Sequence, residues 1–166
     1  MSETNPNKWG KEFEDLCQES LEAQGYEVER EVTDKKWGSP KANKGKCDLH
    51  VYEDGVLIAT LECKHKHNNT FDFKTYVKPH QIKYLKEKYF EGIISAYIIC
   101  IKYTGRKTKP DEKHYLFLSY KQYANMIANK QSGLGLKNMI FATRIEEKDG
   151  LLDFRSVLKE RLDERV

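Results

Sequence analysis

The stretch KCDLHVYEDGVLIATLECK, residues 46–64, decides the fold of this 166-residue chain, because it has the pattern of a β-hairpin. An apolar run that begins after Asp48 leads into the turn residues Glu53-Asp54-Gly55, and an aliphatic run from Val56 to Lys64 follows. Side chains alternate between the two faces of a strand. Glu62 and Lys64 therefore point to one face of the second strand, and the aliphatic side chains point to the other.

The face on which Asp48 lies depends on the turn. A two-residue loop would pair Asp48 with Leu61 and put the two carboxylates of the hairpin on opposite faces. A three-residue loop, with Gly55 left-handed in a G1 bulge, would instead pair Asp48 with Thr60. Glu62 would then be the diagonal neighbour of Asp48 on the same face. We predict the three-residue register.

That register suits metal-assisted hydrolysis. Asp48 and Glu62 offer hard oxygen ligands to Mg²⁺, with Mn²⁺ as a plausible substitute, and the backbone carbonyl of Cys63 could complete the coordination. Such an ion polarises a phosphoryl oxygen and lowers the pKa of a bound water. The Lys64 ammonium, on the same face, could orient that water or stabilise charge on the phosphate.

Asp48 followed by Glu62-Cys63-Lys64 resembles the PD-(D/E)xK nuclease signature, with Cys47 in the place of the usual Pro. The triplet Glu146-Glu147-Lys148 also fits, but no acidic residue occurs from position 113 to position 145 to complete a site there. The resemblance implies an α/β fold of restriction-endonuclease-like type, with a mixed central β-sheet flanked by α-helices.

The overall composition indicates one ordinary globular domain, residues 1–166. No apolar run is long enough to span a membrane, and no signal-peptide pattern is present, so we expect no membrane partner. The four cysteines are dispersed without a CxxC pair, which favours reduced thiols in a cytoplasmic protein.

Charge is strongly segregated along the chain. The formal net charge is only +3, yet residues 35–144 hold 21 Lys and Arg against 9 Asp and Glu, a net +12, and the two ends together carry −9. A basic middle that surrounds a carboxylate pair is typical of a protein that binds the phosphate backbone of DNA.

Before the hairpin, residues 1–7 are predicted to form a frayed tail and residues 8–24 a helix that ends at Gly25. Glu14 lies beside the apolar stripe of this helix, with Glu12 and Asp15 as the nearest alternatives. Residues 26–32 alternate like a strand. Residues 34–46 are predicted to form a mobile basic loop that contacts DNA through Lys35, Lys36, Trp37, Lys41, Lys44 and Lys46.

After the hairpin, a basic segment is predicted to contact phosphates through His65, Lys66, His67, Lys74 and Lys78. Pro79 then begins a helix that Gly92 ends, and Gln81 lies in its first turn.

The order of motifs along the chain resembles that of RecU-type Holliday-junction resolvases of Gram-positive bacteria and their phages. These motifs are GxxFE, Asp, ExK, a basic loop that contains Phe, and a His-Gln pair at a helix start. The resemblance implies that Gln81 lies at the active site and that Glu14 lies near the metal. It also implies a homodimer, because two symmetric cuts resolve a junction. The chain departs from these resolvases in its short segment between the first helix and the hairpin, and in having Lys46 where Thr is usual.

Farther along, residues 93–102 are predicted to form the central buried strand, residues 104–113 a polar loop and residues 115–118 a short strand. Ser119 is predicted to cap a helix to Asn129 with Tyr123, Met126 and Ile127 inward. Residues 131–137 are predicted to turn, residues 139–143 to form a strand and residues 151–162 to form a closing helix.

The sequence thus predicts a Mg²⁺-dependent endodeoxyribonuclease that resolves four-way DNA junctions, with Asp48, Glu62, Lys64, Gln81 and Glu14 as its catalytic residues. Two alternatives stay open. One is another PD-(D/E)xK endonuclease, of restriction or repair type, that acts on linear or nicked DNA. The other is a non-catalytic DNA-binding module whose carboxylates are structural.

Overall fold

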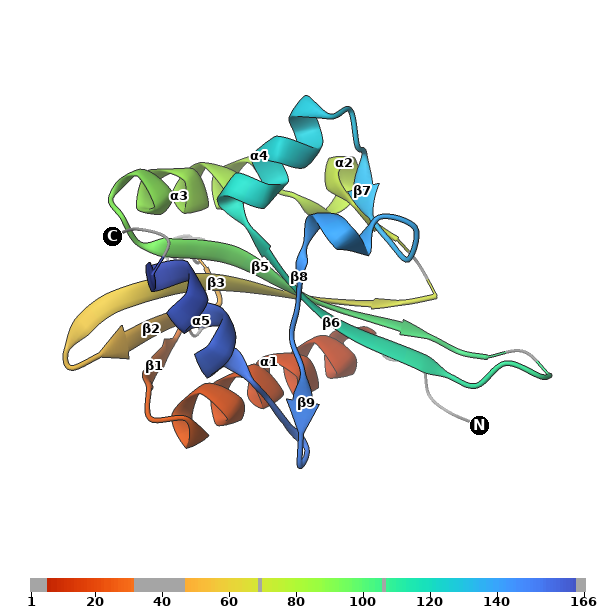
Figure 1. Ribbon diagram of the computed structural model, residues 1–166, viewed down its shortest axis with the longest axis horizontal. Coiled ribbons are helices and arrows are strands. Elements are labelled where there is room, and N and C mark those ends of the chain that lie inside the picture. The colour runs from red at the N-terminus through yellow and green to blue at the C-terminus, as the bar shows by residue number, and fades with distance from the viewer. Residues whose placement is uncertain (1–5, 32–46, 69, 106, 164–166) are drawn as a thin grey trace, which may run out of the picture.

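The computed structural model describes residues 6–31, 47–68, 70–105 and 107–163. Its centre is a six-stranded mixed sheet with the strand order β1-β2-β3-β5-β6-β8 (Figure 1). These strands are β1 (Glu27–Arg30), β2 (Leu49–Glu53), β3 (Val56–His67), β5 (Ile94–Tyr103), β6 (Glu112–Ser119) and β8 (Thr143–Arg144). β3 and β5 are parallel, and the other neighbours are antiparallel. The predicted α/β fold with a mixed sheet flanked by helices is therefore confirmed.

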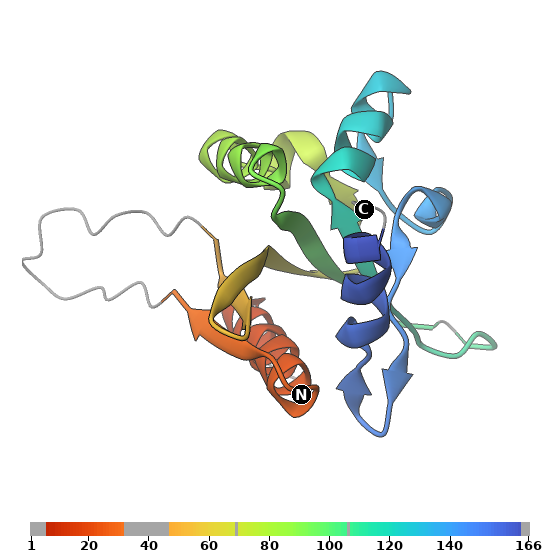
Figure 2. The ribbon, with the colours of Figure 1, turned by 60° about the vertical axis from the view of Figure 1, so that its left-hand side comes forward.

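Helices cover both faces of the sheet. The helices are α1 (Pro6–Ala23), α2 (Phe73–Tyr76), α3 (Pro79–Phe90), α4 (Tyr120–Ala128) and α5 (Phe154–Asp163). In Figure 1, α2, α3 and α4 lie above the sheet and α1 and α5 lie below it, and Figure 2 shows the same two layers from another side. One apolar core lies between the sheet and α1 with α5, and a second lies between the sheet and α3 with α4.

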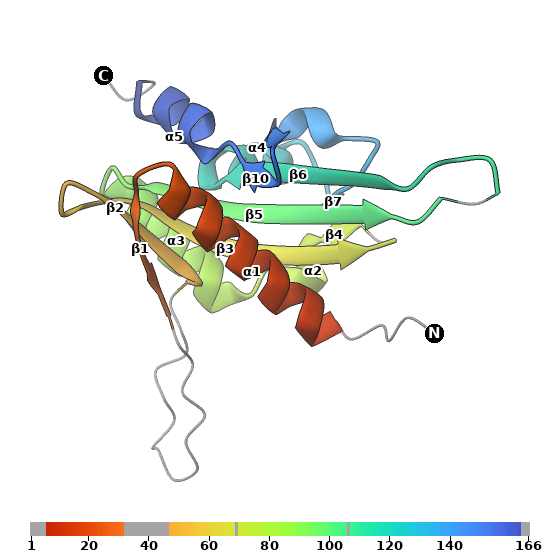
Figure 3. The same cartoon turned by 90° about the horizontal axis from the view of Figure 1, so that it is seen from below.

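β5 is the most deeply buried strand, as predicted from its continuous apolar sequence. Eight residues in succession from Ile94 are buried, because one face of the strand packs against the first core and the other face packs against the second. Around the main sheet lie two short ladders, β4 (Phe71–Asp72) with β7 (Gly133–Leu134) and β9 (Glu147–Lys148) with β10 (Leu151–Leu152). β3, β5 and β6 extend together beyond the shorter β1 and β2 (Figure 3).

The β2–β3 turn differs from the prediction. Glu53 pairs with Val56, so the loop has two residues, and both Asp54 (φ 50°) and Gly55 (φ 76°) are left-handed, as in a type I′ turn. The bulge lies farther along β3, where Val51 pairs with Ala59 and Tyr52 with Leu57. The ladder skips Ile58 and therefore shifts by one residue.

That shift decides the position of Asp48. The ladder runs to Leu49 opposite Leu61, and its next step places Asp48 opposite Glu62 rather than opposite Thr60. The predicted turn was wrong, but the two carboxylates do share a face. They are direct cross-strand neighbours rather than diagonal ones.

Five other predictions need correction. β6 begins at Glu112, earlier than the strand predicted at 115–118, and the predicted strand at 139–143 is a 3₁₀ helix (Met139–Phe141) followed by β8. The last helix begins at Phe154, because residues 151–152 belong to β10. Residues 6 and 7 open α1 instead of ending a tail. Ile127 was predicted to point inward but is 48% exposed. Met126 is the residue of α4 that is buried in the core, and the side chain of Ile127 points away from it toward solvent.

Within the described part of the chain, no helix is both long and apolar enough to cross a membrane.

Candidate active site

The carboxylate pair lies where β2 and β3 separate. Asp48 precedes the first residue of β2, and Glu62 lies in the middle of β3, on the face that α3 covers. The Cys63 backbone N–H donates to Oδ2 of Asp48 at 2.7 Å. A residue in a strand directs its N–H and its C=O to the same side, so the Cys63 carbonyl also faces Asp48. The two carboxylates and this carbonyl form a compact set of hard oxygen atoms.

Glu62 is nearly inaccessible to solvent, and two residues contact its Oε1 atom. The side-chain amide of Gln81, in the first turn of α3, donates to Oε1 at 2.6 Å. The ammonium of Lys64 lies 3.3 Å from the same oxygen, and its side chain is 23% exposed. α3 therefore places Gln81 over the carboxylate, and β3 supplies a cation that still reaches solvent.

Burial and the neighbouring carboxylate disfavour the charged form of Glu62. Desolvation, and next the negative charge of Asp48, raise the pKa of Glu62 from 4.5 to about 8, against a smaller opposing effect of Lys64. Desolvation also raises the pKa of Asp48, and the hydrogen bond from the Cys63 N–H opposes this shift. In the metal-free site the pair thus shares a proton, and a divalent cation bound between the carboxylates would replace it.

The donor set fits a small hard cation. Mg²⁺ is commonly bound through one or two carboxylates, with water and substrate phosphates as its other ligands. Asp48, Glu62 and the Cys63 carbonyl supply such a set. In the described part of the chain, no group of three or more His, Cys, Asp and Glu residues is arranged to hold a metal ion, so this site offers two acidic side chains rather than a full protein cage.

Glu14 reaches the site through its charge rather than by direct contact. Its Oε2 pairs with Arg30 Nη2 of β1 at 2.7 Å, and the other guanidinium nitrogen bonds Asp15. The negative charge of Glu14 raises the pKa of Asp48. Of the alternatives weighed for this helix, Asp15 shares the Arg30 clamp, and Glu12 instead pairs with Lys8.

Sequence reasoning missed Arg30 and Tyr97. Arg30 fixes two acidic side chains of α1, and its place in an alternating strand beside that helix was the available signal. Tyr97 lies opposite Glu62 on β5, and the charge of Glu62 adds to the burial that raises the Tyr97 pKa. Among the described residues, the buried Tyr97 hydroxyl and the buried Oε1 of Gln81 have no hydrogen-bond partner. No sequence motif indicated that Tyr97 faces the site, because it lies in a continuous apolar run.

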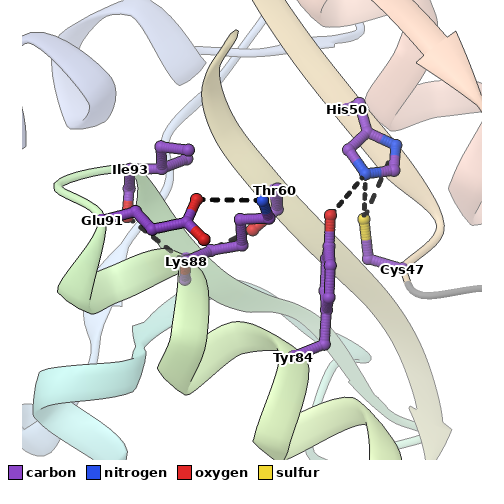
Figure 4. Close-up of polar contacts among 8 residues, drawn as sticks. Cys47, His50, Thr60, Tyr84, Lys88, Glu91 and Ile93 are labelled. Atoms are coloured by element: carbon purple, nitrogen blue, oxygen red, sulfur yellow. Dashed lines mark hydrogen bonds and ion pairs between the residues drawn. The ribbon is translucent and has the colours of Figure 1, made fainter.

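A polar contact beside the site ties α3 to the hairpin. Figure 4 shows the Tyr84 hydroxyl and the Cys47 sulfur both in contact with the His50 ring. His50 Nε2 lies 2.9 Å from the Tyr84 oxygen and 3.5 Å from Cys47 Sγ. Burial raises the pKa of the Cys47 thiol, which favours its neutral form in this contact. Because Tyr84 and Gln81 share one helix, this contact helps to fix Gln81 over Glu62.

The predicted DNA-contacting residues fall into three groups. Lys35, Lys36, Trp37, Lys41, Lys44 and Lys46 lie outside the described residues. Lys66, Lys74 and Lys78 lie on or beside the carboxylate face. The Lys66 ammonium is 3.0 Å from the centre of the Tyr76 ring, and burial, then Lys64 and Lys78, lowers its pKa to about 8.

The third group, His65 and His67, is not brought to the site. Because side chains alternate along β3, both point to the opposite face, where they contact Trp9 of α1.

No protein-family model matches this chain, and comparison with curated protein sequences finds no match.

Proposed function

We propose that this protein is a metal-dependent endonuclease that hydrolyses DNA phosphodiesters at the Asp48–Glu62 pair, with Mg²⁺ as its ion. The observation that carries the proposal is the convergence on Glu62: Asp48 is its cross-strand neighbour, and Gln81 and Lys64 both contact its Oε1. Two carboxylates and a lysine at this spacing are the residues of the PD-(D/E)xK signature, so local geometry and motif support the same chemistry.

Each residue has a definite task in this proposal. Asp48 and Glu62 would hold the ion, which supplies charge for the phosphoryl oxygen and acidity for a water molecule. Lys64, partly exposed at the mouth of the site, would orient that water or offset the negative charge that develops on the phosphate. Gln81 would keep the Glu62 carboxylate in one orientation, and its unpartnered Oε1 is available to accept a hydrogen bond from the water.

The proposed substrate is a four-way DNA junction. The resemblance to RecU-type resolvases supports a four-way junction as substrate, and a homodimer that makes the two cuts. The basic middle of the chain supports DNA as partner. The four free, buried cysteines support a reducing compartment, which we propose is the cytoplasm.

The test compares cleavage of a synthetic four-way junction with cleavage of a linear duplex of the same sequence. Both are incubated with Mg²⁺ or with EDTA, for the natural protein, Lys64→Ala and the control Lys159→Ala, an exposed lysine on α5. We expect paired nicks on the junction that disappear in EDTA and in Lys64→Ala and persist in the control. Equal cutting of the linear duplex would keep the nuclease and discard junction selectivity. Binding without cleavage in Mg²⁺ or Mn²⁺ would favour a non-catalytic DNA-binding module.

A further inference from the structure

A cavity of about 300 Å³ opens on the face of the sheet that α1 covers, away from the carboxylate pair. Its walls include Trp9 and Phe13 from α1, His65 from β3, Lys102 from β5, and Lys113 and Tyr115 from β6. The alternation of side chains along β3 separates the two places, because Glu62 and Lys64 point to the α3 face and His65 points to the α1 face. The proposed endonuclease chemistry does not use this cavity.

One edge of the cavity is a row of basic side chains. The register places His67 beside Lys102 and Lys102 directly opposite Lys113, across three adjacent strands. Like charges that face each other across an antiparallel pair are destabilising. The acidic side chain in the cavity wall, Glu12, pairs instead with Lys8 at 3.9 Å, and both of those side chains are well exposed. An anion between the two lysines would relieve their repulsion.

The next row of the sheet is aromatic. His65 lies beside Cys100, and Cys100 lies opposite Tyr115. Phe13 stacks on Tyr115 with ring centres 6.0 Å apart and planes within 16°, and Trp9 lies 5.7 Å from the His65 ring. Burial, followed by the positive charge of Lys113, lowers the pKa of His65, so this row is uncharged near neutral pH. Phe13 and Tyr115 are buried, and the Lys113 ammonium lies 5.3 Å from the centre of the Tyr115 ring. The partly exposed Trp9 is therefore the aromatic surface that adjoins the two cations.

We propose that this cavity binds one nucleotide unit, with its phosphate between Lys102 and Lys113 and its base against Trp9. Stacking on aromatic rings beside a positive groove is how proteins hold unpaired nucleotides without reading their sequence. The cavity volume is at the lower end of small-molecule sites, which suits a single nucleotide and excludes a duplex. The nucleotide could be free or part of an unpaired strand, and both sources present the same base and phosphate.

Tryptophan fluorescence gives a direct test, because the chain has only two tryptophans. In a Trp37→Phe background, Trp9 is the sole reporter, and deoxyadenosine monophosphate is titrated in EDTA. We expect saturable quenching, with binding about tenfold weaker in Lys102→Gln and in Lys113→Gln, since each loses one charged contact to phosphate. Lys121→Gln is the matched control, because Lys121 is exposed on α4 over the other face. Circular dichroism checks that each variant is folded.

Further ligands and one further variant complete the test. Deoxyadenosine and inorganic phosphate should each bind more weakly than the nucleotide. Tighter binding of an unpaired oligonucleotide than of the mononucleotide would identify a DNA strand as the source, and the reverse order would identify a free nucleotide. Glu62→Gln should bind as well as the parent protein, whether or not the nuclease proposal holds. Absence of saturation, equal affinity for inorganic phosphate, indifference to both lysine variants, or loss of binding in Glu62→Gln would each overturn the proposal.

Discussion

Glu62 makes the stability of the metal-free protein depend on pH. Its pKa rises from 4.5 to about 8 on folding, chiefly through burial. Between these values the folded protein keeps a proton that the unfolded chain releases, so the free energy of unfolding falls as pH rises. In EDTA we expect the ionisation of Glu62 to lower the free energy of unfolding by about 4 kcal/mol across this window. Urea unfolding at a series of pH values measures it.

The matched variant for this prediction is Glu62→Gln, which keeps the shape of the side chain and cannot ionise. Other titrating groups, including His65 with its lowered pKa, are common to both proteins. The difference between the two pH profiles therefore reports Glu62 together with its coupling to Asp48. If the natural protein and the variant gave parallel profiles of unfolding free energy against pH, the Glu62 carboxyl would ionise normally in the folded protein.

Gln81 tests whether α3 takes part in the chemistry. Gln81→Met keeps the length of the side chain and removes the amide that donates to Glu62 Oε1. Loss of a residue that orients a metal ligand typically costs tenfold to a hundredfold in metal affinity or activity. We expect a loss of about this size in the cleavage rate at limiting Mg²⁺. Lys83→Met, two positions along the same helix and exposed, should cleave normally. Equal rates for the two variants would remove Gln81 from the site.

At the scale of elements, α3 is attached to the hairpin through the Tyr84 hydroxyl and His50. Tyr84→Phe removes the hydroxyl that contacts His50, and we expect the free energy of unfolding to fall by about 1 kcal/mol. Tyr89→Phe is the control on the same helix. The Tyr89 ring packs on Tyr120, and its hydroxyl has no hydrogen-bond partner among the described residues. Thermal unfolding measures both. Similar losses would mean that the contact contributes nothing specific.

The elements that the sequence predicted are those with a local physical signal. α1, α3 and β5 follow from apolar periodicity or an apolar run, and Ser119 does cap α4, where its hydroxyl accepts from the Gln122 N–H. The β9–β10 hairpin had such a signal too, because its Asp149-Gly150 turn has the same left-handed pair as Asp54-Gly55. That dipeptide was not used, so the closing helix was predicted too long.

The turn of the β2–β3 hairpin had a local signal in Asp54-Gly55, but the bulge that completes its register had none. The bulge falls at Ile58, inside a run of aliphatic residues that suits either register, and only packing against the two cores selects one. The identity of the site could be predicted because Asp48, Glu62 and Lys64 form a motif. Its surroundings could not be predicted, because Arg30, which pairs with Glu14, and Tyr97, which lies opposite Glu62, come from other strands.

Across the whole molecule, the sheet separates two differently built faces. α1 and α5, from the acidic ends of the chain, lie together on one face, and the carboxylate pair opens on the other beside α2 and α3 (Figure 1). The cavity with Lys102 and Lys113 lies on the α1 face. A DNA duplex bound on the opposite face, where the carboxylate pair lies, would therefore leave this cavity unoccupied. We therefore expect the proposed binding of DNA and the proposed binding of a nucleotide to be separable by mutation.

Lys74 lies on α2 and Lys78 lies beside it, and both are exposed. They should add electrostatic affinity for DNA on the face of the carboxylate pair. Each phosphate contact releases condensed counterions, so Lys74→Gln and Lys78→Gln should each reduce the slope of log affinity against log salt by about 1. Fluorescence anisotropy of a labelled duplex, with Ca²⁺ in place of Mg²⁺ to suppress cleavage, measures the slope. Lys159→Gln, on α5, should keep the parent slope, because it lies on the opposite face. A smaller slope in Lys159→Gln alone would mean that DNA binds the α1 face, and the carboxylate pair would then lose its substrate.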